Sequence, residues 1–163
     1  TRLVGSEMCI RDRICNEYRF VVFVIMDKKL HQYLSGFGVK PSLQRLAIME
    51  YLMTHRTHPT ADEIFNALSP SMPTLSKTTV YNTLKLFAEQ GAVLSLDIDP
   101  KNTHFDGDIT PHAHFYCKSC GAIHDLSVVE GGRLMQAVPD GLQVTEVQVY
   151  YKGLCRKCSQ GVD

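Results

Sequence analysis

Apolar residues recur at helical spacing through the first half of the chain and predict four helices between residues 27 and 91. Glycines end the first helix near Phe37, and Ser42 is the expected N-cap of the second. Thr60 and Glu63 form a capping-box pattern, in which each side chain serves the other's backbone donor at the start of the third helix. The core residues expected on the first two helices are Leu30, Tyr33, Leu34, Leu46, Met49, Leu52 and Met53.

The predicted fourth helix starts at Ser76, ends at Gly91 and has two chemically different faces. Val80, Leu84 and Phe87 recur at i, i+4 and i+7, which predicts that they are buried. The other face has two lysines, hydroxyls and an amide, and no acid. Its members are Lys77, Thr78, Tyr81, Asn82 and Lys85. Such a set suits a DNA major groove, where Lys contacts phosphate and Asn contacts a base edge. A solvated helix surface is the alternative.

A hairpin is expected directly after the fourth helix. Residues 92–98 alternate as in a strand, residues 99–102 are typical of a turn, and residues 103–105 return as a second strand. Helices followed by such a hairpin form a winged helix-turn-helix, with the basic, polar helix in the recognition position.

The rest of the chain predicts short strands around two cysteine pairs. Residues 112–117 and 121–126 are expected to pair with each other, and residues 142–151 alternate as in a long strand. A short helix is expected over residues 132–138. The predicted fold class is therefore α+β, with an N-terminal winged helix-turn-helix and a C-terminal α/β domain.

Four cysteines stand in two C-x-x-C pairs: Cys117, Cys120, Cys155 and Cys158. Two such pairs can bring four thiolates into a tetrahedron, which is the closed structural site that Zn²⁺ prefers. Two disulfides or a redox-active C-x-x-C are the alternatives. Metal-type cysteine pairs are typical of a reducing cytoplasm, where we expect the protein to be.

Two histidines just before the first cysteine pair point to a second metal, because four sulfurs already fill a zinc shell. His112 and His114 are two positions apart, so their imidazoles face the same side of a strand. Cys117 lies an odd number of residues after His114, so its side chain faces the opposite side of the strand. One strand is therefore expected to serve zinc on one face and another metal on the other.

The amino-acid composition excludes few classes of function. The formal net charge is zero, so no global basic balance indicates nucleic acid, although a small basic face can be offset elsewhere. A hydrophobic content of 44% allows a proper core. The only long apolar run, residues 20–26, is too short to span a bilayer, so no membrane association is expected.

Residues 1–26 are expected to be a non-native or disordered extension. Residues 6–13 resemble translated sequencing adapter, so we expect the natural start at Met26 and no function for Cys9 and Cys15. A signal peptide is the alternative, since basic residues precede the apolar run, but no small-residue cleavage site follows it.

Residues 27–158 resemble the ferric uptake regulator (Fur) family of metal-dependent repressors, and most of all its peroxide-sensing branch (PerR). The motifs behind the resemblance are Gln44-Arg45, His58-Pro59-Thr60-Ala61, Thr79-Val80-Tyr81-Asn82, His104-Phe105-Asp106, His112-Ala113-His114 and the two C-x-x-C pairs. The resemblance implies a DNA-binding domain over residues 27–107 and a dimerisation and metal-binding domain over residues 108–163. It also implies a homodimer that binds a palindromic operator in double-stranded DNA.

A regulatory metal site is implied by the same resemblance, with the ligands His58, Asp106, His112, His114 and Asp125. Three imidazoles and two carboxylates without a thiolate favour Fe²⁺ or Mn²⁺. His58 belongs to the recognition domain and the others lie at or beyond the hinge, so bound metal is expected to set the orientation of the domains. In the peroxide branch, Fe²⁺-dependent oxidation of His58 or His112 then releases the metal and the DNA.

Departures from the family pattern bear on the branch and on the number of sites. Asn82 stands where iron-uptake regulators usually have Arg, which favours the peroxide branch. Pro111 and Ala113 stand at two places where some iron sensors have ligands of an extra site, so no third metal is expected. The alternatives are an iron- or zinc-uptake repressor of the same family, a non-haem iron enzyme, and a zinc-ribbon module without DNA binding. An enzyme is not expected, because five protein ligands leave little room for substrate.

Overall fold

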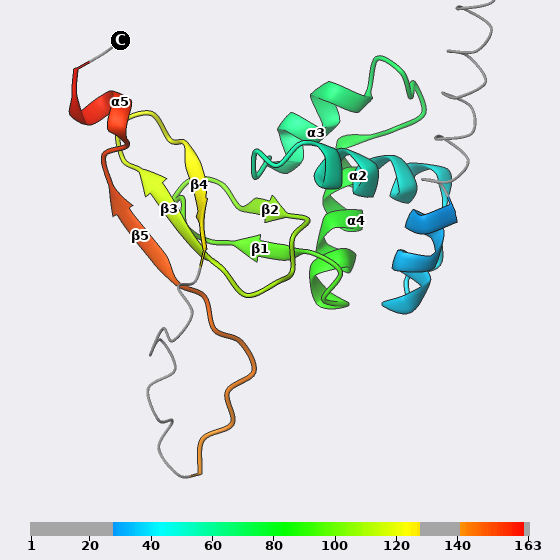
Figure 1. The fold of residues 1–163 in the computed structure, drawn as a ribbon. Helices are drawn as coiled ribbons and strands as arrows, with labels where there is room; N and C mark the ends of the chain where they lie inside the picture. Colours follow the sequence, from blue (N-terminus) through cyan, green and yellow to red (C-terminus); the bar gives the residue numbers. More distant parts are fainter. Residues whose placement is uncertain (1–27, 128–140, 162–163) are drawn as a thin grey trace, which may run out of the picture.

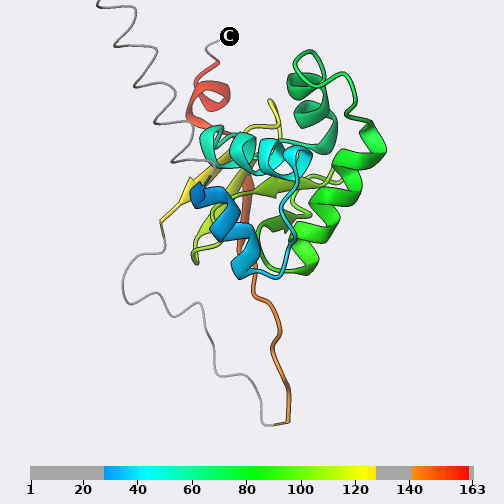
Figure 2. The same cartoon turned by 90° about the vertical axis from the view of Figure 1, so that its right-hand side faces the viewer.

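The computed structural model describes residues 28–127 and 141–161. The predicted helix 132–138 and the N-terminal extension lie outside the described residues. Figure 1 shows a helical part and a C-terminal sheet on either side of a two-stranded wing. Figure 2 views the molecule from the helical side, with residues 28–36 and α2 in front of the strands.

Helices occupy residues 28–36, α2 (Leu43–Thr54), α3 (Ala61–Leu68) and α4 (Lys77–Glu89). Each of the three labelled helices starts where a hydroxyl side chain caps it. The caps are Ser42, Thr60 and Ser76, and the capping box of Thr60 and Glu63 forms as predicted. Local sequence therefore determines where these helices begin, because the first backbone N–H groups of a helix need acceptors.

The helical core forms where the apolar spacing predicts it. Val80, Leu84 and Phe87 are completely buried in α4, and Leu30, Leu34, Met49 and Leu52 are buried against them. Tyr33, Leu46 and Met53 are only partly buried. Ile48, which the prediction omitted, is completely buried. Burying one such aliphatic or aromatic side chain contributes about 1.5–3 kcal/mol, so this core holds α4 in place.

The wing consists of β1 (Leu94–Leu96) and β2 (His104–Asp106), paired antiparallel. Its strands differ from the predicted limits because Ala92 and Val93 pack into the helical core instead of pairing. The order of three capped helices and a hairpin confirms the winged helix-turn-helix.

The C-terminal sheet has the strand order β4-β3-β5, with β3 (Ala113–Cys117) in the centre. β4 (Ile123–Leu126) pairs antiparallel with it, and β5 (Tyr150–Gly153) pairs parallel. The short helix α5 (Arg156–Ser159) follows β5. Helices and a sheet in separate parts confirm the α+β class. None of the helices in the described part of the chain is long and apolar enough to cross a membrane.

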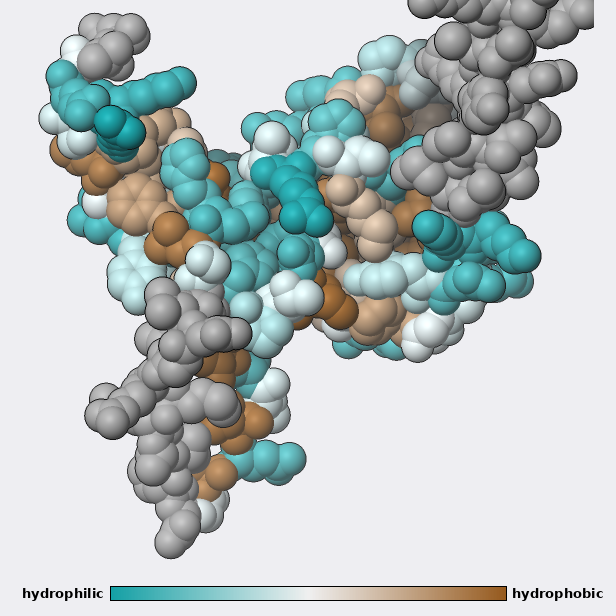
Figure 3. Space-filling view, viewed as in Figure 1, coloured by the Kyte–Doolittle hydropathy of each residue, from teal (hydrophilic) through white to brown (hydrophobic). Residues whose placement is uncertain are grey.

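The prediction of a strand over residues 142–151 was wrong for most of its length. Only Tyr150 and Tyr151 belong to a strand, and residues 142–149 form none. A strand exists only where a neighbouring backbone pairs with it, and β3 begins at Ala113, too late to pair with the earlier residues. Leu142, Val144 and Val147 are consequently exposed. Figure 3 shows hydrophobic residues along this projecting segment.

Candidate metal centres and nucleic-acid interface

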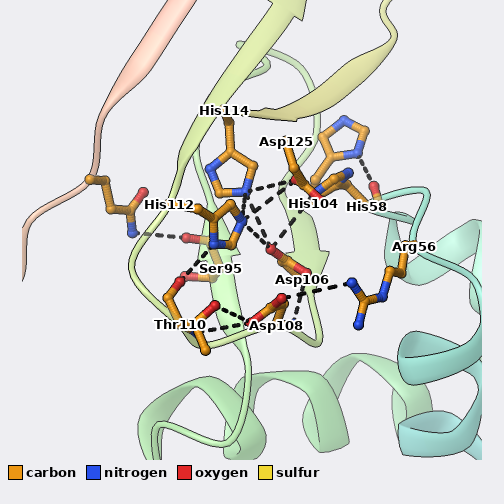
Figure 4. A network of polar contacts seen from close by, with 11 residues as sticks. Arg56, His58, Ser95, His104, Asp106, Asp108, Thr110, His112, His114 and Asp125 are labelled. Carbon is orange, nitrogen blue, oxygen red and sulfur yellow. Dashed lines mark hydrogen bonds and ion pairs between the residues drawn. The ribbon is translucent and has the colours of Figure 1, made fainter. Parts of the chain in front are cut away.

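Five side chains from both halves of the molecule meet at one point, and they are the five that the resemblance implies. His58 precedes α3, Asp106 ends β2, His114 lies in β3 and Asp125 in β4. His112 lies just before β3. Each offers one ligand atom, and these atoms all lie within 4.8 Å of one another (Figure 4).

Asp106 lies at the centre of this cluster. Its Oδ2 is 2.9 Å from Nε2 of His112, 3.3 Å from Nε2 of His114 and 3.6 Å from Nε2 of His58. Asp125 closes the other side, with Oδ1 2.6 Å from Nε2 of His58. Three imidazole nitrogens and two carboxylates thus surround a common centre, which is a donor set suited to a divalent cation.

The surroundings of His58 indicate why this cluster fits a cation. The residue is only 3% exposed, its Nδ1 has no hydrogen-bond partner among the described residues, and its Nε2 faces the Asp125 and Asp106 carboxylate oxygens at 2.6 and 3.6 Å. Its backbone φ is 52°, a conformation that costs on the order of 1–3 kcal/mol for a residue other than glycine. Two carboxylates directed at one buried imidazole nitrogen are a favourable arrangement for a cation. A metal ion at the centre would accept the Nε2 lone pair of His58 and contact both carboxylates.

Charge in the cluster also favours a cation. Burial lowers the pKa of His58, but the Asp106 and Asp125 carboxylates outweigh burial and leave the pKa above its ordinary value. Burial raises the pKa of Asp106, but hydrogen bonds from His114, His58 and the Asp108 N–H hold that pKa far below its ordinary range. Asp106 is therefore an anion at neutral pH, surrounded by imidazoles.

Neighbouring backbone groups contact those atoms of Asp106 and His112 that face away from the centre of the cluster. The Asp108 N–H donates to Oδ1 of Asp106 at 2.9 Å, which leaves Oδ2 for the centre. Nδ1 of His112 lies 2.7 Å from the Thr110 carbonyl oxygen. A carbonyl only accepts, so Nδ1 donates to it, and Nε2 is the nitrogen directed at the centre.

The second cluster contains the four cysteines of the C-x-x-C pairs, whose sulfurs also lie within 4.8 Å of one another. All four are free, and the sulfurs of Cys120 and Cys155 are 3.9 Å apart, against about 2.05 Å in a disulfide. Backbone N–H groups of Cys120 and Cys155 lower the pKa of Cys117 to about 6. Four sulfurs at this separation, one of them a thiolate near neutral pH, can hold a tetrahedral Zn²⁺.

β3 serves both clusters, as strand parity predicts. His112 and His114 face the His/Asp cluster, with their Nε2 atoms 3.0 Å apart. Cys117 faces the sulfur cluster and is completely buried. The shared strand thus joins the sulfur cluster to the His/Asp cluster.

The recognition face, defined as Lys77, Thr78, Tyr81, Asn82 and Lys85, is exposed on α4. Tyr81 is 61% exposed and borders a hollow of about 330 Å³ between α3, α4 and the wing. Tertiary packing adds an acid that the sequence pattern did not predict, because Oδ1 of Asp62 in α3 lies 2.8 Å from Nζ of Lys77. Lys77 is therefore partly neutralised, whereas Nζ of Lys85 lies 3.9 Å from Oε1 of Glu89.

One residue that the sequence analysis left out contacts the first cluster. Nδ1 of His104 lies 2.6 Å from the carbonyl oxygen of His58. The only sequence signal was its position in the same motif as Asp106, because His104 matches none of the expected ligand positions.

Comparison with known proteins identifies relatives over most of the chain. Residues 36–152 match the model of the ferric uptake regulator family. The peroxide-responsive repressor PerR of Staphylococcus epidermidis is 39% identical over 141 residues, 83% of this chain and 93% of that protein. The repressor of the same name from Staphylococcus aureus is 40% identical over 124 residues, 74% of this chain and 83% of that protein.

Solved structures have the same fold. The manganese-containing ferric uptake regulator of Pseudomonas aeruginosa aligns with a TM-score of 0.64 at 21% identity, covering 78% of this chain and 98% of that one. The ferric uptake regulator of Vibrio cholerae aligns with a TM-score of 0.62 at 27% identity, covering 77% and 98%.

Proposed function

The chain belongs to the ferric uptake regulator family and is similar to peroxide-responsive repressors; on that premise, we propose that it is a metal-dependent repressor that responds to peroxide. Members of the family are regulators rather than enzymes. The observation behind the proposal is the meeting of three imidazoles and two carboxylates at the junction of the recognition part and the C-terminal sheet.

We assign the two clusters to different metals. The four-sulfur cluster is the structural Zn²⁺ site, because soft thiolates in a tetrahedron select zinc. The His/Asp cluster is the regulatory site for Fe²⁺ or Mn²⁺, because it has no sulfur and more ligands than a tetrahedron uses.

Residues on both sides of the hinge hold the regulatory metal. His58 and Asp106 belong to residues 27–107, the proposed DNA-binding domain, whereas His112, His114 and Asp125 belong to residues 108–163, the proposed dimerisation domain. A bound cation stabilises only the arrangement in which both sets meet, so it selects one orientation of α4. This selection makes operator binding depend on metal.

We further propose that the repressor is a two-fold symmetric homodimer. The exposed apolar residues in β5 and in the segments that flank it support the use of this part of the chain as the dimer interface; they are Leu142, Val144, Val147, Tyr151 and Leu154. A two-fold dimer presents two recognition helices to a palindromic site in double-stranded DNA.

Peroxide sensing follows from the identity of the ligands. Fe²⁺, when bound, would activate peroxide beside the ligand rings with no net change in its own oxidation state. A ring carbon of His58 or His112 would gain one oxygen as the O–O bond breaks, peroxide would take the two electrons that the imidazole loses, and the other oxygen would leave as water. An oxidised imidazole is a weaker ligand, so the tie between the domains is lost and DNA is released. The cysteine thiolates are expected to be spared at low peroxide, because their electron pairs are committed to zinc.

The decisive experiment adds peroxide to operator-bound protein loaded with zinc and either Fe²⁺ or Mn²⁺. Release of DNA from the Fe²⁺ form alone, with oxygen on His58 or His112 in peptide mass spectra, is expected. An iron-uptake repressor would instead keep its DNA until a chelator removes the metal. Oxidation of the cysteines with both histidines untouched would replace this mechanism with a thiol switch.

Substitutions on the recognition face are expected to separate base recognition from phosphate binding. Tyr81→Ala and Asn82→Ala should each weaken operator binding by about 1–3 kcal/mol if the side chain contacts a base. Lys85→Ala, which removes an exposed cation, should weaken binding to all sequences and flatten the salt dependence. Lys77→Ala should have a smaller effect of the same kind, because Asp62 already pairs with that lysine.

Titrations against operator and scrambled duplexes at several salt concentrations measure both effects. Equal losses on the two duplexes for all four variants would show that the recognition face reads no bases.

A further inference from the structure

β2 contacts the regulatory cluster twice, once through Asp106 and once through His104. The two residues are two positions apart on one strand, so their side chains point to the same face. Asp106 reaches the centre of the cluster directly, 3.6 Å from Nε2 of His58. Nδ1 of His104 instead reaches the backbone carbonyl of His58 at 2.6 Å (Figure 4). This carbonyl only accepts, so Nδ1 of His104 is the donor.

Backbone contacts extend this hold on the segment that contains His58. The Phe105 N–H donates to the Pro59 carbonyl at 3.0 Å, and Thr60 forms an isolated antiparallel bridge with His104. The carbonyl groups of His58 and Pro59 are thus both tied to β2. His58 itself is buried in a left-handed backbone conformation, which persists only where its surroundings enforce it.

Asp99, in the turn of the wing, fixes the His104 ring from its other side. Its Oδ2 lies 3.5 Å from Nε2 of His104, and both side chains are mostly buried, with exposures of 13% for His104 and 11% for Asp99. Oδ1 of Asp99 also accepts a hydrogen bond from the Tyr116 hydroxyl of β3 at 3.4 Å. The imidazole of His104 is therefore held between the wing turn and the His58 carbonyl.

We propose that His104 is a positioning residue of the regulatory metal site, which holds His58 in its strained backbone conformation so that Nε2 points at the metal. This inference deepens the proposed function and rests on it. Through Asp99, the same ring ties the ligand His58 to the turn of the wing, next to the hollow lined by Tyr81 and Lys101. The residue that aims the metal ligand thus also contacts the wing.

Two substitutions at this position separate the proposed role from simple packing. His104→Phe keeps an aromatic ring but removes the hydrogen-bond donor. It should lower the Mn²⁺ affinity of the zinc-loaded protein about 10- to 100-fold, which is the usual loss when a group that orients a metal ligand is removed. His104→Asn keeps a donor near the place of Nδ1 and should recover most of that affinity. His124→Phe is the matched control, because His124 is exposed and adjoins the ligand Asp125 without belonging to the cluster.

A second measurement needs no regulatory metal. Amide hydrogen exchange of the peptide around residues 57–62 should be faster in His104→Phe than in the wild type and in His104→Asn. Zinc content and melting temperature should stay unchanged in all three. Exchange and Mn²⁺ affinity both unchanged in His104→Phe would overturn the positioning role. If the wild-type protein binds no Mn²⁺ but its peptide still exchanges more slowly than that of His104→Phe, the proposed function is overturned. The positioning of the His58 segment by His104 remains supported in that case.

Discussion

Cys117→Ser is expected to abolish zinc binding and unfold the C-terminal sheet, which is the largest stability loss that one substitution in this protein should cause. Among the described residues beyond 107, only Ala113 and Cys117 are buried apolar residues, so this sheet has almost no core of its own within one chain. Structural zinc contributes roughly 10–16 kcal/mol of binding free energy in small zinc domains, and that energy is folding free energy. Removing one thiolate removes most of it.

The sulfur cluster ties three parts of the sheet together. Cys117 ends β3, Cys120 lies in the turn before β4, and Cys155 and Cys158 lie at the N-cap and within α5, after β5. Cys158→Ser should therefore have the same effect as Cys117→Ser. Metal analysis, thermal melting and sedimentation velocity measure zinc content, stability and dimer. Lys118→Ala, between the first two cysteines, should leave all three unchanged. A zinc-free Cys117→Ser protein with normal melting and an intact dimer would refute the structural assignment.

Asp106→Asn is expected to remove regulation by metal while leaving the fold and zinc intact. The Asp106 carboxylate contacts the Nε2 atoms of three imidazoles, and it is the most central anion of the cluster. Asparagine can still accept from the Asp108 N–H, so the turn survives and only the negative charge is lost. Loss of a residue that only orients a metal ligand lowers metal affinity by up to ~100-fold. Asp106 is itself a proposed ligand, so we expect the Mn²⁺ and Fe²⁺ affinities to fall by at least that factor.

Operator binding should then no longer respond to added Mn²⁺, because the domains lose the tie that selects one orientation. Fluorescence anisotropy with operator DNA across a Mn²⁺ titration measures this response. Asp108→Asn is the matched control, since its carboxylate accepts from Thr110 and lies outside the cluster. A normal Mn²⁺ response in Asp106→Asn would mean that regulation uses another site.

Features that depend on neighbours along the chain were predictable from the sequence. Helix starts follow from hydroxyl caps, and the buried face of α4 follows from apolar spacing, because both are properties of a single helix. The opposite orientation of His114 and Cys117 follows from the period of a strand, whatever surrounds it. The four sulfurs were expected from their spacing alone. His58, Asp106 and Asp125 came from the family resemblance, since no local pattern joins residues so far apart.

Tertiary structure decided what depends on the packing of distant segments. Residues 142–149 alternate like a strand, but β3 begins at Ala113 and reaches back only to the Val149 carbonyl, so the strand is limited to Tyr150–Gly153. Asp62 pairs with Lys77 and partly neutralises it only because α3 packs against α4. His104 matches no ligand pattern, and its contact with the His58 carbonyl spans 46 residues of sequence. Periodicity predicts which side of an element faces inward, whereas the identity of the residue it meets there depends on how the whole chain folds.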